Sequence, residues 1–315
     1  MMRFTLLAVV VFVAAALAMP QSGPGAVPKA APTPVGLQYD EIARMAVPPA
    51  TPPPPGSFGA DYAKLMNPAQ SASEDEDPAA AAIAKAMGGK MPPGMNFMQG
   101  KLTRYAFYKG WVRTDDVLAK TAEIRKCDVH QFIALDLAKK TYHLSDRSAD
   151  DMNAGQEAAP GAQTGPGTAV FTVSRKGASL GPMTLEGVAT NGYRSVSSMN
   201  ITKATGSCQQ GTFSSIQTEY VSGIREPHAF CPLNRNAMGM PETGGCKPTM
   251  KAQSSGAIAP AGKLVMYAKT AMLPAGSTDE NASGSAFVTQ RGNVKVLYLT
   301  DAAPLFSIPA DFTKI

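Results

Sequence analysis

One serine of this chain stands in a pattern used for nucleophilic catalysis. Gly177-Ala178-Ser179-Leu180-Gly181 matches G-x-S-x-G, which in hydrolases places the serine on a sharp turn between a strand and a helix. A strand is predicted before the pattern, but Pro182 and the residues from Met183 predict another strand after it. The downstream histidine is His228, and the candidate acids are Glu186, Glu219 and Glu226. A secreted serine hydrolase is therefore an alternative function. The plainer interpretation is a β-hairpin turn whose glycines supply positive φ.

Four cysteines could form either a metal site or disulfides: Cys127, Cys208, Cys231 and Cys246. His228, Cys231 and Cys246 could hold zinc with a fourth ligand such as Cys208, although the spacing is irregular. The chain carries an export signal, described below, and an oxidising compartment favours two disulfides over thiolate ligands. Three pairings are open. We favour Cys231 with Cys246, which would close the Pro- and Gly-rich stretch between them and leave Cys127 to pair with Cys208.

Methionines recur every three or four residues in one Gly- and Pro-containing stretch, at Met87, Met91, Met95 and Met98. Thioethers at such spacing can bind Cu(I), a soft ion that prefers sulfur. Methionine is also an adaptable filler of apolar surfaces. A copper-binding envelope protein is therefore a second alternative, and no other cofactor is indicated.

The elements that must position these residues change character at Gly100. After it, short stretches rich in aromatic and β-branched residues alternate with Gly, Asp, Asn and Lys turns, which is typical of antiparallel sheet. Strands are predicted over 102–113, 122–127, 131–137, 141–144, 169–173, 183–189, 193–203, 212–222, 264–272, 286–290 and 294–300, with a turn at 291–293. Residues 145–167 and 223–262 are predicted to be irregular. The absence of βαβ alternation predicts a mainly β (α+β) fold with few short helices.

The stretch before Gly100 is dominated by Pro, Ala and Gly, including the run from Pro52 to Pro55. We expect residues 19–99 to form a flexible Pro/Ala-rich linker, extended where proline dominates. Short helices are predicted within it over 36–46 and 75–87. Residues 100–315 then form the antiparallel β domain.

The N-terminus reads as a cleavable signal peptide over residues 1–18. Arg3 supplies a positive charge, Leu6 to Leu17 an apolar core, and Ala16-Leu17-Ala18 a small-x-small cleavage site. The apolar run is shorter than the about 20 residues that a spanning helix needs, and no later segment approaches that length. We therefore expect an exported, periplasmic or secreted protein without a transmembrane segment.

The net charge of +5 is spread over single Lys and Arg residues, which argues against nucleic acid as a partner.

Several short motifs carry a family resemblance: Lys109 to Arg113 (Lys-Gly-Trp-Val-Arg), a hairpin from Leu135 to Leu144, Asn191-Gly192-Tyr193, and the ending from Leu305 to Phe312. Together they resemble exported bacterial proteins of unknown function that look similar to the LolA and LppX lipoprotein-carrier superfamily. The resemblance implies a curved antiparallel sheet, or incomplete barrel, with helices covering its concave face. It transfers no catalytic or binding residue, because none of these motifs is a known site signature.

The function expected from this fold is binding without catalysis. The curved sheet would hold a hydrophobic ligand, such as a lipid or acyl chain, or a protein partner. The copper protein and the serine hydrolase are the alternatives.

Overall fold

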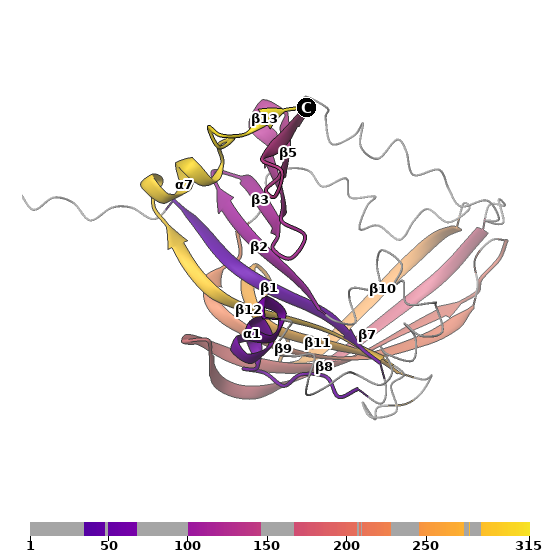
Figure 1. The fold of residues 1–315 in the computed structure, drawn as a ribbon. Helices are drawn as coiled ribbons and strands as arrows, with labels where there is room; N and C mark the ends of the chain where they lie inside the picture. Colours follow the sequence, from indigo (N-terminus) through magenta and orange to yellow (C-terminus); the bar gives the residue numbers. More distant parts are fainter. Residues whose placement is uncertain are drawn as a thin grey trace, which may run out of the picture. The chain divides into compact units, whose positions relative to one another are not determined.

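The described part of the chain forms one large, open, curved sheet of thirteen strands (Figure 1). The computed structural model describes residues 35–47, 50–67, 100–145, 167–206, 208, 210–227, 246–273, 277 and 285–315, without the side chains of residues 127 and 246–248. The mainly β fold class is confirmed. No helix in these ranges has the length and hydropathy needed to cross a bilayer.

The strand order in the sheet is β10-β7-β8-β9-β11-β12-β1-β2-β3-β4-β5-β6-β13. All neighbours are antiparallel except the outermost pairs, β10 with β7 and β13 with β6, which are parallel. The strands are β1 (Gly36–Ala46), β2 (Lys101–Tyr108), β3 (Trp111–Asp116), β4 (Thr121–Lys126), β5 (Gln131–Asp136), β6 (Thr141–Ser145), β7 (Gly167–Leu185), β8 (Val188–Thr202), β9 (Gly211–Arg225), β10 (Cys246–Gly256), β11 (Lys263–Leu273), β12 (Ser285–Leu297) and β13 (Thr313–Lys314). Helices α1 (Phe58–Met66) and α7 (Leu299–Leu305) and a 3₁₀ turn, η1 (Cys127–Val129), complete the described elements.

The tight hairpins follow from residues that accept positive φ. Lys109 and Gly110 both have positive φ between β2 and β3, so the predicted strand over 102–113 is in fact two strands. Glu186 and Gly187 form the same kind of two-residue turn between β7 and β8, which places a turn inside the strand predicted over 183–189. Two-residue hairpins with positive φ at both positions match the natural twist of antiparallel strands.

The prediction of a helix over 36–46 is wrong, because these residues form β1 between β12 and β2. Leu37 and Tyr39 are buried on one face of the sheet, and Ile42 is buried on the other. A strand buried on both faces has apolar residues at uneven spacing, which a short sequence window cannot distinguish from one face of a helix. The strand also moves the start of the folded unit from residue 100 to Pro34.

Three further expectations in the C-terminal half are wrong. The turn predicted at 291–293 does not exist, since β12 runs unbroken through it and pairs with β1 across a bulge at Tyr39. The end of the strand predicted over 294–300 is instead the start of α7. The stretch 223–262, predicted to be irregular, contains β10.

Both helices pack on one face of the sheet, which we call the inner face. Phe58 of α1 packs with Ile42 and Leu102, and Phe306, which follows α7, packs with Tyr108. A Cβ built at Gly56, beside α1, would lie 3.7 Å from Leu185 of β7, although several strands separate β7 from β1. The sheet therefore curls toward the face that carries α1.

The C-terminal tail closes the end of the sheet near α7. The amide of Thr313 donates to the carbonyl of Lys140, and Arg113 donates to the carbonyl of Leu305 at 2.8 Å. Three of the four segments that carried the family resemblance thus meet in one hydrophobic cluster. Packing around this cluster gives these segments a structural role.

Candidate binding groove at the edge of the sheet

The candidate site lies where no described helix covers the sheet, on β7, β8 and the edge strand β10. The registers place Gln253 beside Ser174 and Ser255 beside Lys176, and Lys176 beside Val196. From Val196, cross-strand pairing continues residue by residue through β9, β11 and β12 and ends at Ala46 of β1. Ala46 shares a face with Ile42, which contacts α1, so Lys176 and its row project from the inner face.

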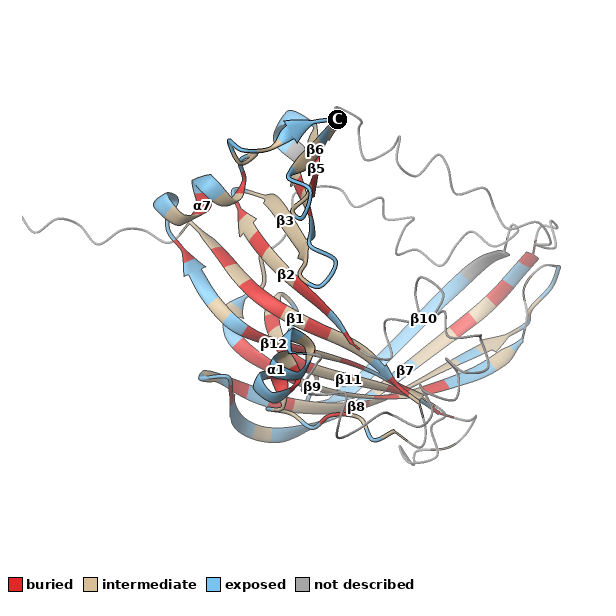
Figure 2. Ribbon diagram, viewed as in Figure 1, coloured by how far each residue is buried: buried red, intermediate tan, exposed pale blue. Residues whose placement is uncertain are grey.

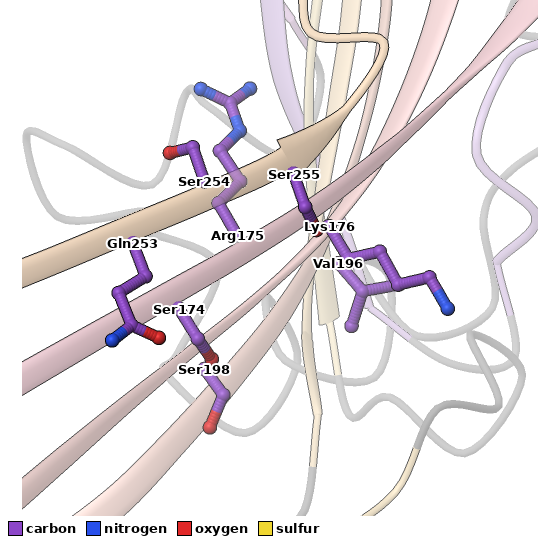
Figure 3. A pocket seen from close by; sticks show the side chains of 8 residues that line it. All are labelled: Ser174, Arg175, Lys176, Val196, Ser198, Gln253, Ser254 and Ser255. Atoms are coloured by element: carbon purple, nitrogen blue, oxygen red, sulfur yellow. The ribbon is translucent and has the colours of Figure 1, made fainter.

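A groove of about 720 Å³ follows these three strands (Figure 3). It is lined by Ser174, Arg175, Lys176, Val196, Ser198, Gln253, Ser254 and Ser255. Figure 3 shows the side chains of Arg175 and Ser254 projecting to the side of the sheet opposite to Ser174 and Gln253, as the strand alternation requires. Every lining residue except Val196 carries a hydroxyl, amide or cationic group.

Arg175 is held in place by a polar network on the side opposite the inner face. Its Nε donates to the Ser195 hydroxyl at 3.0 Å, and its guanidinium reaches Gln217 at 3.1 Å and Glu219 at 3.3 Å. Burial raises the pKa of the Glu219 carboxyl, and the Arg175 charge opposes this shift only in part. Arg175 thus serves as a structural cation, because its charge is already matched within the sheet.

Two other basic side chains of this region have no ion-pair partner among the described residues. Lys176 and Lys251 are exposed and make no ion pair or hydrogen bond with any described residue. Both lie on the inner face, because Lys251 alternates with Gln253 and Ser255 along β10. The sequences of β7, β8 and β10 together contain five basic residues and no Asp or Glu: Arg175, Lys176, Arg194, Lys247 and Lys251. The sequences of these three strands therefore carry a net positive charge.

Ser179 does not lie on a nucleophile elbow. It is inside β7, where a bulge falls between Ser179 and Gly181, and strand continues to Leu185. The serine hydroxyl accepts a bond from the Gly181 amide at 3.3 Å. The strand-turn-helix context that a G-x-S-x-G nucleophile requires is absent here, and so is the predicted hairpin turn.

The two glycines of the same motif are required by the backbone of the sheet. A Cβ at Gly177 would lie 2.1 Å from the carbonyl oxygen of Ala257, so the chain leaving β10 crosses β7 in direct backbone contact. Gly181 has a φ of 85° at the bulge. The pattern thus marks a close approach and a bulge.

Most of the other predicted site residues lie outside the described residues. This holds for His228, for Cys231, for Met87, Met91, Met95 and Met98, and for the side chains of Cys127 and Cys246. Cys208 is disulfide-bonded, but its partner is not among the described side chains, so the pairing stays a prediction. In the described ranges, no group of three or more His, Cys, Asp or Glu residues could hold a metal ion.

Three buried polar clusters, which the sequence did not reveal, lie in the middle of the sheet around β12, β1 and β2, and β9 and β11 separate them from the groove-bearing strands. Asp40, 1% exposed, accepts two bonds from Arg104 and one from Asn293. A second cluster joins α1 to the sheet through Asp61 and Gln290. In the third, Arg291 of β12 bonds to Glu41 of β1 and to Glu226, which follows β9. Their charges are paired within the protein, so they stabilise the sheet. Only register could reveal them, because their members are far apart in sequence.

A row of exposed apolar side chains crosses the opposite, outer face of the sheet. Met45 is paired with Phe287, and Met272 and Phe213 follow at diagonal positions on β11 and β9. These four side chains are between 41% and 51% exposed. We call them the outer apolar row.

Comparison with protein-family models, with curated proteins and with solved structures finds no match for this chain. The similarity to the lipoprotein-carrier superfamily therefore stays a prediction.

Proposed function

We propose that this protein is an exported, non-enzymatic binding protein that holds an extended segment of a protein partner at the β10 edge of its curved sheet. The proposal rests on the unpaired outer side of β10. β10 pairs with β7 over eleven consecutive residues and has no strand on its other side in the described part of the chain. Residues 249–256 of β10 are exposed, and this part of the strand is pale blue in Figure 2. An unpaired strand edge offers a row of backbone donors and acceptors to an added strand.

The types of residue that line the groove support a polypeptide ligand. Val196 is the one apolar side chain among the described residues that line it. Hydrophobic ligands in proteins are buried among mainly apolar side chains. A peptide backbone, in contrast, can bond to the strand edge while its side chains meet hydroxyl and amide groups.

Photo-crosslinking in the protein's own host tests this function. A photoreactive amino acid replaces Met250 or Ser254 on β10 in one set of variants, and Leu118, exposed in the β3–β4 turn, in the control. We expect a defined protein adduct from both β10 positions and none from Leu118. Equal adduct patterns at all three positions, or no protein adduct from β10, would show that the edge has no partner.

A hydrophobic ligand is the second candidate, and the outer apolar row favours it. Native mass spectrometry of protein from its own host should then detect a bound lipid. Phe287→Ser should remove the lipid, while Leu118→Ser, at an equally exposed site, should retain it. A clean protein mass for the unaltered chain would contradict this candidate.

A further inference from the structure

The charge of the edge specifies what kind of segment it accepts, if the proposed function holds. Lys251 lies on β10 itself, and Lys176 lies one strand inward, level with Ser255. A strand added to β10 would place alternate side chains on the inner face, next to these two lysines, which have no ion-pair partner in the described part of the chain. Opposite charges at such cross-strand positions attract, and like charges repel.

The backbone of β10 indicates which amides would bond to the added strand. Pro248 has no amide hydrogen, and proline is tolerated in a sheet where its nitrogen faces the open side. The backbone groups of alternate residues point to the same side of a strand. The amides of Met250, Ala252 and Ser254 therefore face outward, and those of Lys251 and Gln253 face β7.

A second copy of this chain does not fit the edge well. Pairing β10 with another β10 would bring together two strands that contain lysine and no acidic residue. Lysine and proline on an edge strand are features that prevent indiscriminate pairing. They restrict the edge to a segment that compensates the charge.

We propose that the β10 edge selects an acidic, extended segment of a partner protein, with Asp or Glu at alternate positions, and binds it by strand addition. The backbone bonds would come from the outward amides of β10, and the selectivity from Lys251 and Lys176. The opposite edge of the sheet is less suitable, because β13 is only two residues long.

Synthetic peptides test the proposal on the full mature chain. The probe is a short peptide of alternating Thr and Glu, and the controls replace every Glu by Gln or by Lys. We expect the Glu peptide to bind about 10-fold or more tightly than the Gln peptide, since several ion pairs of modest strength add up, and the Lys peptide not to bind. Equal affinity for the Glu and Gln peptides would overturn the charge selection.

Variants of the chain locate the peptide. Lys176→Gln and Lys251→Gln should each weaken Glu-peptide binding by about 2- to 5-fold. Lys295→Gln, an exposed lysine on β12, should leave it unchanged. Hydrogen exchange gives the second readout: bound Glu peptide should slow exchange at Met250, Ala252 and Ser254 relative to its rate in the free chain. Binding without slower exchange at these amides would overturn strand addition.

Two other anionic occupants give different results. The chain's own acidic run, Glu74 to Asp77, lies outside the described residues. Replacing these residues by Gln and Asn could raise the affinity for the Glu peptide about 10-fold. That result would show that the acidic run itself occupies the β10 edge at high effective concentration, and it would overturn the proposal of a partner protein. Binding to phosphatidylglycerol vesicles, lost in Lys176→Gln and Lys251→Gln without protection of the β10 amides, would assign the edge to a lipid surface.

The inference and the function on which it rests fail in different ways. Protein adducts from Met250 and Ser254 together with no Glu-peptide binding would reject the acidic segment and keep the binding function. If neither protein adducts nor Glu-peptide binding were found, both the binding function and the acidic segment would be rejected.

Discussion

At the scale of single residues, Gly177 allows the chain after β10 to cross β7. Gly177→Ala would place a Cβ 2.1 Å from the Ala257 carbonyl oxygen, so the crossing backbone must move. We expect the free energy of unfolding to fall by about 1–3 kcal/mol. Gly223→Ala in β9 is the matched control, because its Cβ meets nothing within 4 Å, and it should be neutral or stabilise by up to about 1 kcal/mol. Urea unfolding of both variants measures the difference, and equal stabilities would refute the close crossing.

The Asp40 carboxylate is the most deeply buried charge in the described part of the chain, and Arg104 is its cationic partner. Arg104→Met would leave the carboxylate buried with the Asn293 amide alone, which should cost about 3 kcal/mol of unfolding free energy. Lys101→Met removes an exposed cation 3.8 Å from Asp116 and should cost about 0–1 kcal/mol. Chemical denaturation checks both. A loss for Arg104→Met no larger than that for Lys101→Met would mean that the buried pair contributes nothing.

Glu219 should make stability depend on pH. Burial raises the pKa of its carboxyl above the ordinary value of 4.5, so the folded chain binds the proton more readily than the unfolded chain. The burial penalty is present at neutral pH and disappears as the pH falls through the folded-state pKa. The unfolding free energy of the wild type, minus that of Glu219→Gln, should therefore increase as the pH is lowered from about 7 toward 5. A difference that is flat or falls over this window would contradict the raised pKa.

At the scale of elements, α1 and β12 meet where Phe58 lies on the backbone of Gly292. A Cβ at Gly292 would lie 2.3 Å from the Phe58 ring. Gly292→Ala should therefore cost about 1–3 kcal/mol, and Phe58→Ala about 3–5 kcal/mol.

A double-mutant cycle separates this contact from local backbone effects. With the ring removed, the added methyl has room, so Gly292→Ala should be nearly neutral in the Phe58→Ala background. Full additivity of the two losses would exclude the contact.

The sequence predicted those elements whose signals are local. The β5–β6 hairpin was placed correctly, because Asp136 accepts the amides of Ala138 and Lys139 within the turn itself. Turn residues at 291–293 predict a chain reversal that does not occur. There, Gly292 makes room for the Phe58 ring, and Asn293 has positive φ in a bulge. Glycine and asparagine mark unusual backbone, but whether that backbone reverses the chain depends on its partners.

At the scale of the whole molecule, the boundaries of the folded unit are testable by truncation. A chain that starts at Pro34 keeps β1 and should fold with unchanged strand content, since the compact unit begins there. A chain that starts at Gly100 lacks the strand that joins β12 to β2, and we expect it to lose cooperative unfolding. Circular dichroism and thermal melting distinguish these outcomes. Cooperative melting of the shorter chain would show that the sheet does not need β1.

The groove could not be predicted from sequence, for a physical reason. Its lining comes from strands whose register is set by long-range pairing, and Ser, Gln and Lys are ordinary surface residues in any single strand. The many Ser and Thr residues of 193–203 and 212–222 do indicate that these strands have a polar face. Ser179 matches a catalytic sequence pattern because the two glycines of that pattern, Gly177 and Gly181, are needed for a close backbone approach and for a bulge.

The position of β1 also has a consequence for how the chain must fold. Gly36 pairs with Leu297 on one side and with Tyr108 on the other, so one of the first strands to be synthesised waits for one of the last. Such distant pairings make folding slow and leave strand edges unprotected until the C-terminal residues arrive. During synthesis, β1 therefore stays without its β12 partner until the C-terminal strands have been made. A chaperone that shields β1 should raise the yield of folded protein more than one that shields the local hairpins of β3 to β6.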